Sequence, residues 1–229
     1  MVRGVPNGRI EATARRPRRS HADRTATTRA KIIAAVNEAI TDVGFQRTTA
    51  SEITQRAGVT WGAVQHHFGG KDGTLAAVLE DSFMRFAERV GGVDVRLPLD
   101  KRVSDFVDRA WEHFDSAHYR STLEILLNFA GQPNLPPEPW QAAMTDALDR
   151  TWRQLFGDAH MSLQRSGALQ RTVIATLSGL ASMRFTEGGA DRRPRAELEI
   201  LKSALSRELR AAGTRRELGA TGTRPGTHR

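Results

Sequence analysis

The chain has 229 residues, 39% of them apolar and 26% charged, as is ordinary for a soluble globular protein of one or two domains. It contains no cysteine, which excludes disulfide bonds, thiolate metal sites and cysteine catalysis. Its net charge is +8, and no segment approaches the roughly 20 consecutive apolar residues that a membrane-spanning helix needs.

Residues 1–24 are predicted to form a disordered basic arm, because arginine, proline and glycine dominate them and apolar side chains are few. Eight arginines stand against Glu11 and Asp23 in residues 1–30, which leaves a net charge of +6. Residues 213–229 are predicted to form a disordered tail with a net charge of +3. Such ends attract nucleic acid first and acidic lipid second, and solubilising tails are the alternative. No apolar stretch follows the arm, so we expect no secretion signal, no membrane partner and a cytoplasmic location.

Residues 25–90 are predicted to form the first domain, with a first helix over residues 28–43. Apolar side chains recur there at the 3.6-residue period of an amphipathic helix. They are Ile32, Val36, Ala39, Ile40 and Val43. Gly44 follows directly, and we expect it to end the helix, because glycine adopts the left-handed conformation that closes many helices.

Two shorter helices are predicted next. Thr49, with Glu52 three residues later, is a capping box, which predicts a helix from residue 50 that Gly58 ends. Thr60 is the expected N-cap of a third helix over residues 61–67. Two such helices joined by a short turn that contains glycine form a helix-turn-helix.

The segment TWGAVQHHFGGKDG, from Thr60 to Gly73, allows two interpretations of its adjacent histidines. Neighbours on a helix point about 100° apart, so His66 and His67 are poorly placed to bind one metal ion, for which helices use i, i+4 spacing. A proton relay would need an orienting carboxylate and a nucleophile, and the sequence identifies neither. We therefore expect no metal site, no cofactor and no catalytic residue.

The other interpretation is a recognition helix in the major groove of DNA. Gly62 and Ala63 are small enough to let the helix approach the bases, and Gln65 is able to pair with adenine through two hydrogen bonds. Helix N-termini and basic side chains would supply phosphate contacts. A helical hairpin that only packs is the plainer alternative. The residues expected to contact DNA are Thr48, Thr49, Thr60, Trp61, Gly62, Ala63, Gln65, His66, His67 and Lys71.

Residues 27–83 resemble the DNA-binding domain of TetR/AcrR-type transcriptional regulators. The resemblance rests on AGVTWGAVQHHFGGKDGTL, preceded by GFQRTTASEIT. This chain differs from most members of the family at two positions. Members commonly have a phosphate-contacting tyrosine where this chain has Gln65, and a lysine or arginine where it has Trp61. The contacts that the family makes there are therefore not transferred to this chain.

Residues 99–212 are predicted to form a second helical domain, which makes an all-α protein of about nine helices. Apolar residues at helical spacing predict these helices, and no strand pattern is found. These helices are expected over residues 99–116, 119–130, 168–186 and 194–212, with a further helix that starts near Pro137. One more helix, over residues 71–90, is expected to end the first domain.

The resemblance implies that the second domain binds a small effector and forms a homodimer. Side chains of aromatic residues and one methionine would line an apolar pocket, although the same spacing is typical of a plain core. The candidates are Phe106, Trp111, Phe114, Trp140, Met144 and Trp152. Small residues and a leucine seam on the last two helices predict a four-helix interface between two chains. These residues are Ser178, Ser182, Leu198, Leu201, Leu205 and Leu209.

These patterns predict a sequence-specific DNA-binding transcriptional regulator. In its simplest form it is a dimeric repressor that a small hydrophobic effector releases from a palindromic operator in double-stranded DNA. An activator, or a global DNA-associated protein without an effector, is the alternative within this class. An α-helical enzyme and a helical interaction module, each with an incidental helix-turn-helix, are the alternatives outside it. No serine elbow, glycine-rich phosphate loop or carboxylate pair supports the enzyme.

Overall fold

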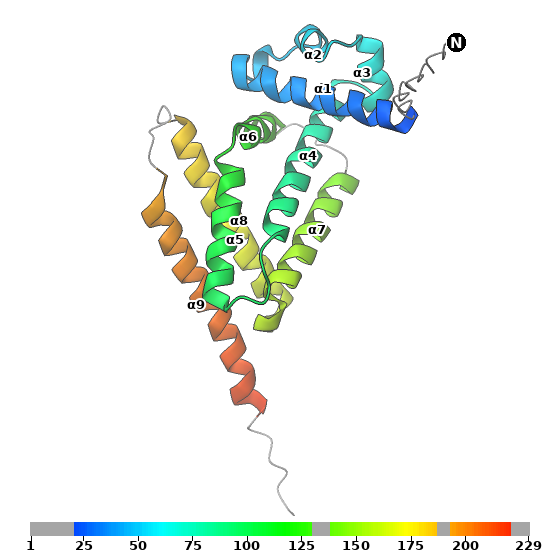
Figure 1. The fold of residues 1–229 in the computed structure, drawn as a ribbon. Coiled ribbons are helices and arrows are strands. Elements are labelled where there is room, and N and C mark those ends of the chain that lie inside the picture. The colour runs from blue at the N-terminus through cyan, green and yellow to red at the C-terminus, as the bar shows by residue number, and fades with distance from the viewer. Residues whose placement is uncertain (1–20, 130–137, 187–192, 221–229) are drawn as a thin grey trace, which may run out of the picture.

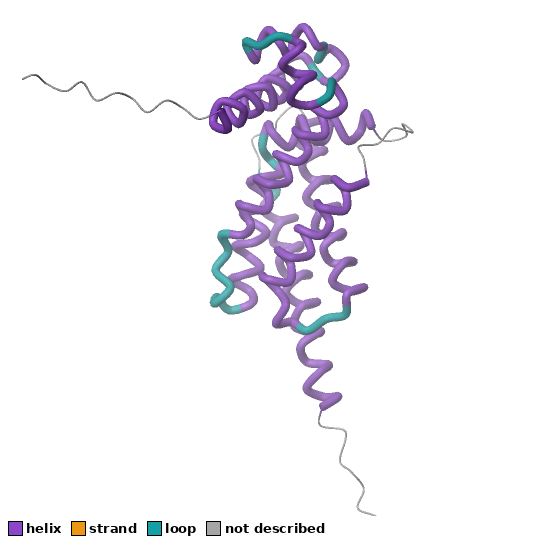
Figure 2. The backbone as a smooth tube through the Cα atoms, turned by 90° about the vertical axis from the view of Figure 1, so that its right-hand side faces the viewer, coloured by secondary structure: helices purple, strands orange, loops and turns teal. Residues whose placement is uncertain are grey.

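Every regular element of the chain is helical in the residues that the computed structural model describes, which are 21–129, 138–186 and 193–220 (Figures 1 and 2). Nine α-helices and two short 3-10 helices occur in these ranges, and no strand does, which confirms the predicted all-α fold. None of the described helices is both long and apolar enough to cross a membrane. The helices are α1 (His21–Val43), η1 (Phe45–Arg47), α2 (Ala50–Ala57), α3 (Trp61–Phe68), α4 (Lys71–Gly91), α5 (Leu99–Phe114), α6 (Ala117–Phe129), α7 (Glu138–Phe156), η2 (Gly157–Ala159), α8 (Leu163–Thr186) and α9 (Arg195–Ala220).

The helix ends differ from the predicted ones mainly where the sequence is polar. Helix α1 begins at His21 rather than at residue 28, so the last residues of the expected arm form its first turn. The hydroxyls of Thr27 and Thr28 donate to carbonyls one turn earlier in this segment, which has no apolar period to reveal it. Helix α9 continues to Ala220, into the expected tail. The rest of the arm and of the tail lies outside the described residues.

Helices α1 and α3 pack against α4, and α2 packs against α1 and α3, so that the three form the upper part of the molecule in Figure 1. Their apolar faces meet in one buried core, because each helix is apolar along one side only. The core includes Ile32, Val36, Ile40, Ile53, Val64, Leu75 and Val78. Ile125 of α6 completes it, so this unit is also packed on the helices below.

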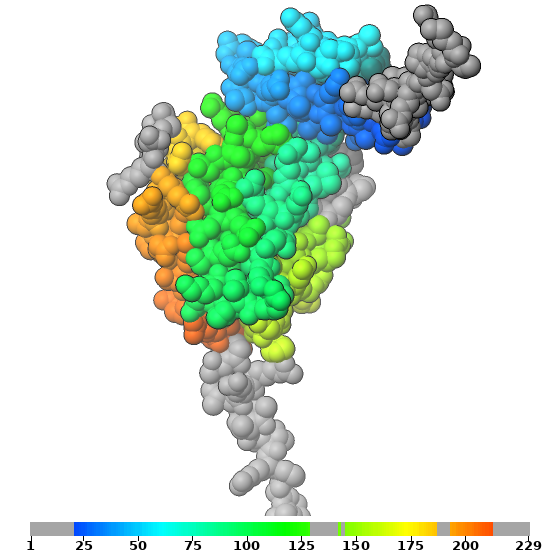
Figure 3. Space-filling model, viewed as in Figure 1, coloured from blue at the N-terminus to red at the C-terminus, as the bar shows by residue number. Residues whose placement is uncertain are grey.

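Helix α4 belongs to two cores. Leu75 and Val78, near its start, lie in the upper core, whereas Phe86 and Val90 lie in the core of the lower bundle. In that bundle α5 packs against α4, α6, α8 and α9 (Figure 1). The space-filling view shows the upper unit seated on the end of this bundle (Figure 3). A movement of α4 within the bundle would therefore reach the upper unit directly.

Candidate nucleic-acid interface and internal cavity

Two threonines set the starts of the helices in the helix-turn-helix. The hydroxyl oxygen of Thr49 accepts a hydrogen bond from the Glu52 amide, and that of Thr60 accepts one from the Ala63 amide, both at 3.2 Å. Between these helices Gly58 has φ 64° and ψ 39°, a left-handed conformation that favours glycine. Both threonines are exposed, and each hydroxyl still has its own hydrogen to donate.

Helix α3 has a buried side and an exposed side. Val64 is fully buried, and Phe68 packs against the upper core. Gly62, Gln65 and His66 are exposed on the other side. The exposed side therefore combines small residues with hydrogen-bonding groups, which is what a helix needs to approach base edges.

The two histidines have different surroundings. His66 is exposed, whereas His67 is half-buried, and their rings lie 5.2 Å apart in an edge-on arrangement. Desolvation lowers the pKa of His67, and the neighbouring His66 and Arg29 lower it further. The described residues contain no group of three or more His, Cys, Asp or Glu side chains that could hold a metal ion.

Three of the expected DNA contacts are placed differently from the others. Thr48 is buried, and its hydroxyl donates to the Gly44 carbonyl at 3.0 Å. Trp61 is half-buried and packs against the upper core. The ammonium of Lys71 lies 5.5 Å from the centre of the Phe45 ring, at the start of α4. Thr48 therefore faces the interior, and only part of Trp61 is open to a ligand.

Arg29 is a residue that the sequence did not reveal. From α1 it donates a hydrogen bond of 2.6 Å to the carbonyl of His67, and its guanidinium lies 4.4 Å from the centre of the Phe68 ring. The last turn of a helix has free carbonyls and a partial negative charge, so a cation there is favourable. Arg29 therefore holds the end of α3. It stands in an arginine-rich segment, 38 residues from its partner, so no local pattern distinguishes it.

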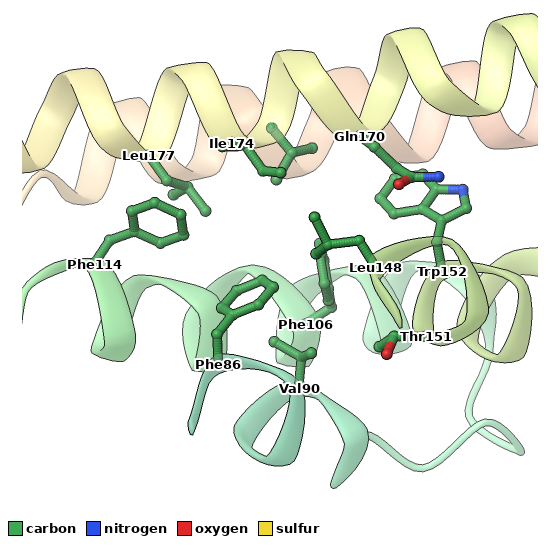
Figure 4. Close-up of a pocket in the computed structure, with 11 residues that line it drawn as sticks. Phe86, Val90, Phe106, Phe114, Leu148, Thr151, Trp152, Gln170, Ile174 and Leu177 are labelled. Atoms are coloured by element: carbon green, nitrogen blue, oxygen red, sulfur yellow. The ribbon is translucent and has the colours of Figure 1, made fainter. Parts of the chain in front are cut away.

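Half of the side chains expected to line a pocket do so. Phe106, Phe114 and Trp152 surround a small cavity of about 20 Å³ with residues of α4, α7 and α8 (Figure 4). Trp111 is buried in the core and is not among the side chains that line this cavity. Trp140 and Met144 belong to α7, but their side chains lie outside the described part of the structure.

A second cavity of about 180 Å³ adjoins the first. The two share Phe86, Phe114, Leu148 and Ile174. A third hollow of about 540 Å³, lined by α7 and α8, shares Leu148 and Ile174 with both and has charged walls. Its charged residues are Asp149, Arg153 and Arg171. The first two cavities are thus lined mainly by apolar side chains, whereas the wall of the third also contains charged ones.

The leucine seam of α9 lies inside the chain. Leu198, Leu201, Leu205 and Leu209 are buried in the lower core, and α9 packs on α5. The sequence-based prediction placed this seam between two chains. The spacing of the leucines does not distinguish the two cases, because a seam of this period packs equally well within one chain. Ser178 also faces inward and bonds Tyr119, while the hydroxyl of Ser182 donates to its own helix.

The free faces of α8 and α9 expose other apolar side chains. Leu163, Met183 and Ile200 are 82%, 56% and 70% exposed. Gly179 and Ser203 are exposed on the same two helices. Large apolar side chains that lie next to small residues on neighbouring helices are typical of a surface that a partner covers.

Comparisons with known proteins agree with this arrangement. Residues 32–78 match the family model described as bacterial regulatory proteins, tetR family. The HTH-type transcriptional regulator BetI of Escherichia coli K12 is 42% identical over an alignment of 178 residues, which covers 64% of this chain and 91% of that protein. BetI 1 of Chromohalobacter salexigens is 45% identical over 51 residues, which are 22% of this chain and 25% of that protein.

Solved structures share the fold. A TetR family transcription regulator from Marinobacter aquaeolei VT8 has a TM-score of 0.61 at 13% identity, over 82% of this chain and 97% of that one. The multidrug binding protein EbrR, solved in complex with imidazole, has a TM-score of 0.56 at 18% identity, over 82% of this chain and 95% of that one.

Proposed function

Because the chain belongs to the tetR family of bacterial regulatory proteins, which are DNA-binding transcriptional regulators, we propose that it acts as a dimeric repressor. Residues 25–90 bind a palindromic operator in double-stranded DNA, and residues 99–212 bind a small effector and a second copy of the chain. Such a protein works in the cytoplasm, where the operator is. The exposed, polar side of α3 is the observation on which this proposal mainly rests.

The DNA contacts follow from the exposed groups of the helix-turn-helix. Thr49 and Thr60 would donate their hydroxyl hydrogens to phosphate oxygens at the starts of α2 and α3. Gln65 and His66 would reach base edges, and Lys71 would contact the backbone. Gly62 and Ala63 would allow α3 to lie close to the groove floor. The proposed interface omits Thr48, because it is buried.

Dimerisation would place two copies of α3 on one face of the DNA. One short helix reads only a few base pairs, and two related helices about 34–36 Å apart match one turn of the duplex. We assign the interface to the free faces of α8 and α9, around Met183 and Ile200, since these large apolar side chains are exposed.

The two apolar cavities would hold the effector. They lie between α4, α5, α6, α7 and α8, and α4 also forms part of the upper core. A molecule that binds better when α4 is displaced would shift the dimer towards a spacing that no longer fits the operator. EbrR, which shares this fold, was solved with a small molecule bound.

Selection from genomic DNA tests the function. The purified protein would be incubated with fragmented genomic DNA at moderate salt, and the retained fragments sequenced. We expect an inverted repeat whose half-sites lie about one helical turn apart. Retention without a shared sequence would contradict a sequence-specific regulator.

A substitution on α3 tests whether Gln65 contacts the bases of the operator. Gln65→Ala should weaken operator binding by about 1–3 kcal/mol, because it removes a base contact. Gln154→Ala is the matched control, since Gln154 is an exposed glutamine on α7, far from the helix-turn-helix. Equal operator affinity for both variants would remove Gln65 from the interface.

A further inference from the structure

The cavity of about 180 Å³ has walls that define what it could hold. Five helices contribute to it, and its side chains are mostly aromatic or aliphatic. The apolar part of the wall includes Phe83, Phe86, Phe114, Leu126, Leu148 and Ile174. A ligand in this space would therefore be apolar over most of its surface.

One pair of hydroxyls supplies a polar point in this wall. The hydroxyl oxygens of Tyr119 and Ser178 lie 2.5 Å apart and join α6 to α8. Burial raises the pKa of Tyr119, so its phenol stays protonated. Whichever hydroxyl donates within the pair, the other retains a hydrogen, and both keep lone pairs. The pair is thus able to give one hydrogen bond to a ligand and to accept one from it.

His113 supplies a second polar point. Its ring packs edge-on against those of Phe86, Phe114 and Tyr119, with centres 5.3 to 5.6 Å apart. Burial, with smaller effects from Arg89, His118 and Arg85, lowers the pKa of His113 to about 4. At neutral pH its imidazole is uncharged and offers one donor and one acceptor.

No Asp, Glu, Lys or Arg lines this cavity in the described part of the chain. The nearby cations Arg85 and Arg89 are paired with Asp81 and Glu112. An ion that entered the cavity would lose part of its hydration without gaining an opposite charge, which is costly. The walls therefore select against charged molecules of either sign.

The volume limits the size of the occupant. An apolar protein cavity of roughly 150 Å³ takes up benzene, whereas drug-sized ligands occupy about 300–1,000 Å³. The space of about 180 Å³ fits one ring with a small substituent.

We propose that this cavity binds an uncharged molecule with an apolar body about the size of one aromatic ring and a single hydrogen-bonding group, which meets the Tyr119–Ser178 pair. The inference rests on the proposed function, because it specifies the chemical class of the effector. Ser178 is then a residue that selects ligands rather than one that joins two chains.

Four probe molecules of similar shape test the proposed chemical class of the ligand. Benzyl alcohol, toluene, benzoate and benzylammonium would each be titrated into the full-length protein at pH 7 by calorimetry. We expect benzyl alcohol to bind most tightly, toluene about tenfold more weakly and both ions roughly a hundredfold more weakly or not at all. Tighter binding of either ion, or no binding of any probe, would overturn the proposal.

A pair of serine variants tests the polar contact. Ser178→Ala should reduce the preference for benzyl alcohol over toluene about threefold, because the ligand hydroxyl then has only the Tyr119 phenol as a partner. Ser182→Ala is the control, since that hydroxyl bonds to its own helix one turn away. The affinity for toluene shows in each variant whether the cavity is intact. Equal preferences in the two variants would overturn the assignment of Ser178.

Different results would contradict the proposed ligand class and the proposed effector role of the cavity. If benzyl alcohol binds the protein but leaves operator affinity unchanged, the ligand class stands and the effector role of the cavity is contradicted. If the ions bind and release the operator, the effector role stands and the ligand class is overturned.

Discussion

Arg29 joins α1, the first helix of the fold, to the end of α3. Its guanidinium donates to the His67 carbonyl and stacks on Phe68, so it limits how α3 tilts on α1. A lysine would keep the positive charge but lose the planar group that stacks. Arg29 therefore positions α3 whether or not it contacts DNA itself.

Substitution of Arg29 should weaken specific binding by loosening α3. We expect both Arg29→Ala and Arg29→Lys to lower operator affinity about tenfold and to speed hydrogen exchange of the α3 amides. Affinity for nonspecific DNA should fall only in the alanine variant, which loses the charge. Parental operator affinity and exchange rates in Arg29→Lys would show that the charge alone matters.

His113 should make stability depend on pH. Its pKa is about 4 in the folded chain, below the usual value of 6.5, so the unfolded chain binds more protons between these values. Stability is then complete above about pH 6.5 and is lost as the pH falls towards 4. Between pH 7 and pH 5 the loss due to His113 should be about 2 kcal/mol.

Urea unfolding at both pH values, at one protein concentration, measures this loss. His113→Phe removes the titrating group and keeps an aromatic ring beside Phe86, so its stability should fall about 2 kcal/mol less than that of the parent. The difference between the two proteins isolates His113 from other titrating groups. Parallel losses in both would show that His113 is not buried as a neutral ring.

The sequence predicted which segments are helical more accurately than it predicted the surfaces against which these helices pack. The N-caps at Thr49 and Thr60 were predictable because capping depends on residues three positions apart. The position of the α9 leucines was not, because their period is the same whether the partner is α5 or a second chain. Thr48 was misplaced for a similar reason, since its bond to Gly44 forms only once η1 has folded.

Helix α6 has one side on the cavity and another on the upper unit. Tyr119, Thr122 and Leu126 line the cavity. On the other side, the Ser121 hydroxyl donates to the Asn37 carbonyl at 3.2 Å, and the Glu124 carboxylate accepts from the Phe45 amide at 3.0 Å. A ligand that shifts α6 would therefore move the start of the helix-turn-helix.

Removal of the Glu124 contact should weaken this coupling. We expect Glu124→Ala to keep its affinity for benzyl alcohol and for the operator, but to reduce the effect of one on the other by about 0.5–2 kcal/mol. Operator affinity with and without benzyl alcohol measures the effect. Glu112→Ala is the control, because it removes an exposed carboxylate on α5 that pairs with Arg89. If both variants respond alike, the coupling does not pass through Glu124.

For the whole molecule, the proposed function requires a second copy, and because the leucine seam is buried within the chain we infer that the contact lies on the opposite side of α9. Ile200 is 70% exposed there, beside the small residues Ser203 and Ala204. At a two-fold interface each substitution occurs twice, so one new carboxylate introduces two negative charges into an apolar contact.

Ile200→Glu should therefore give a monomer where the parent is a dimer. Operator affinity should fall at least about a hundredfold, because the two half-sites are no longer bound by linked helices. Sedimentation equilibrium and operator binding measure the two effects. Val95→Glu is the control, since Val95 is 42% exposed in the loop between α4 and α5. A dimeric variant would place the interface elsewhere, and a monomer with parental affinity would contradict two-fold recognition of the operator.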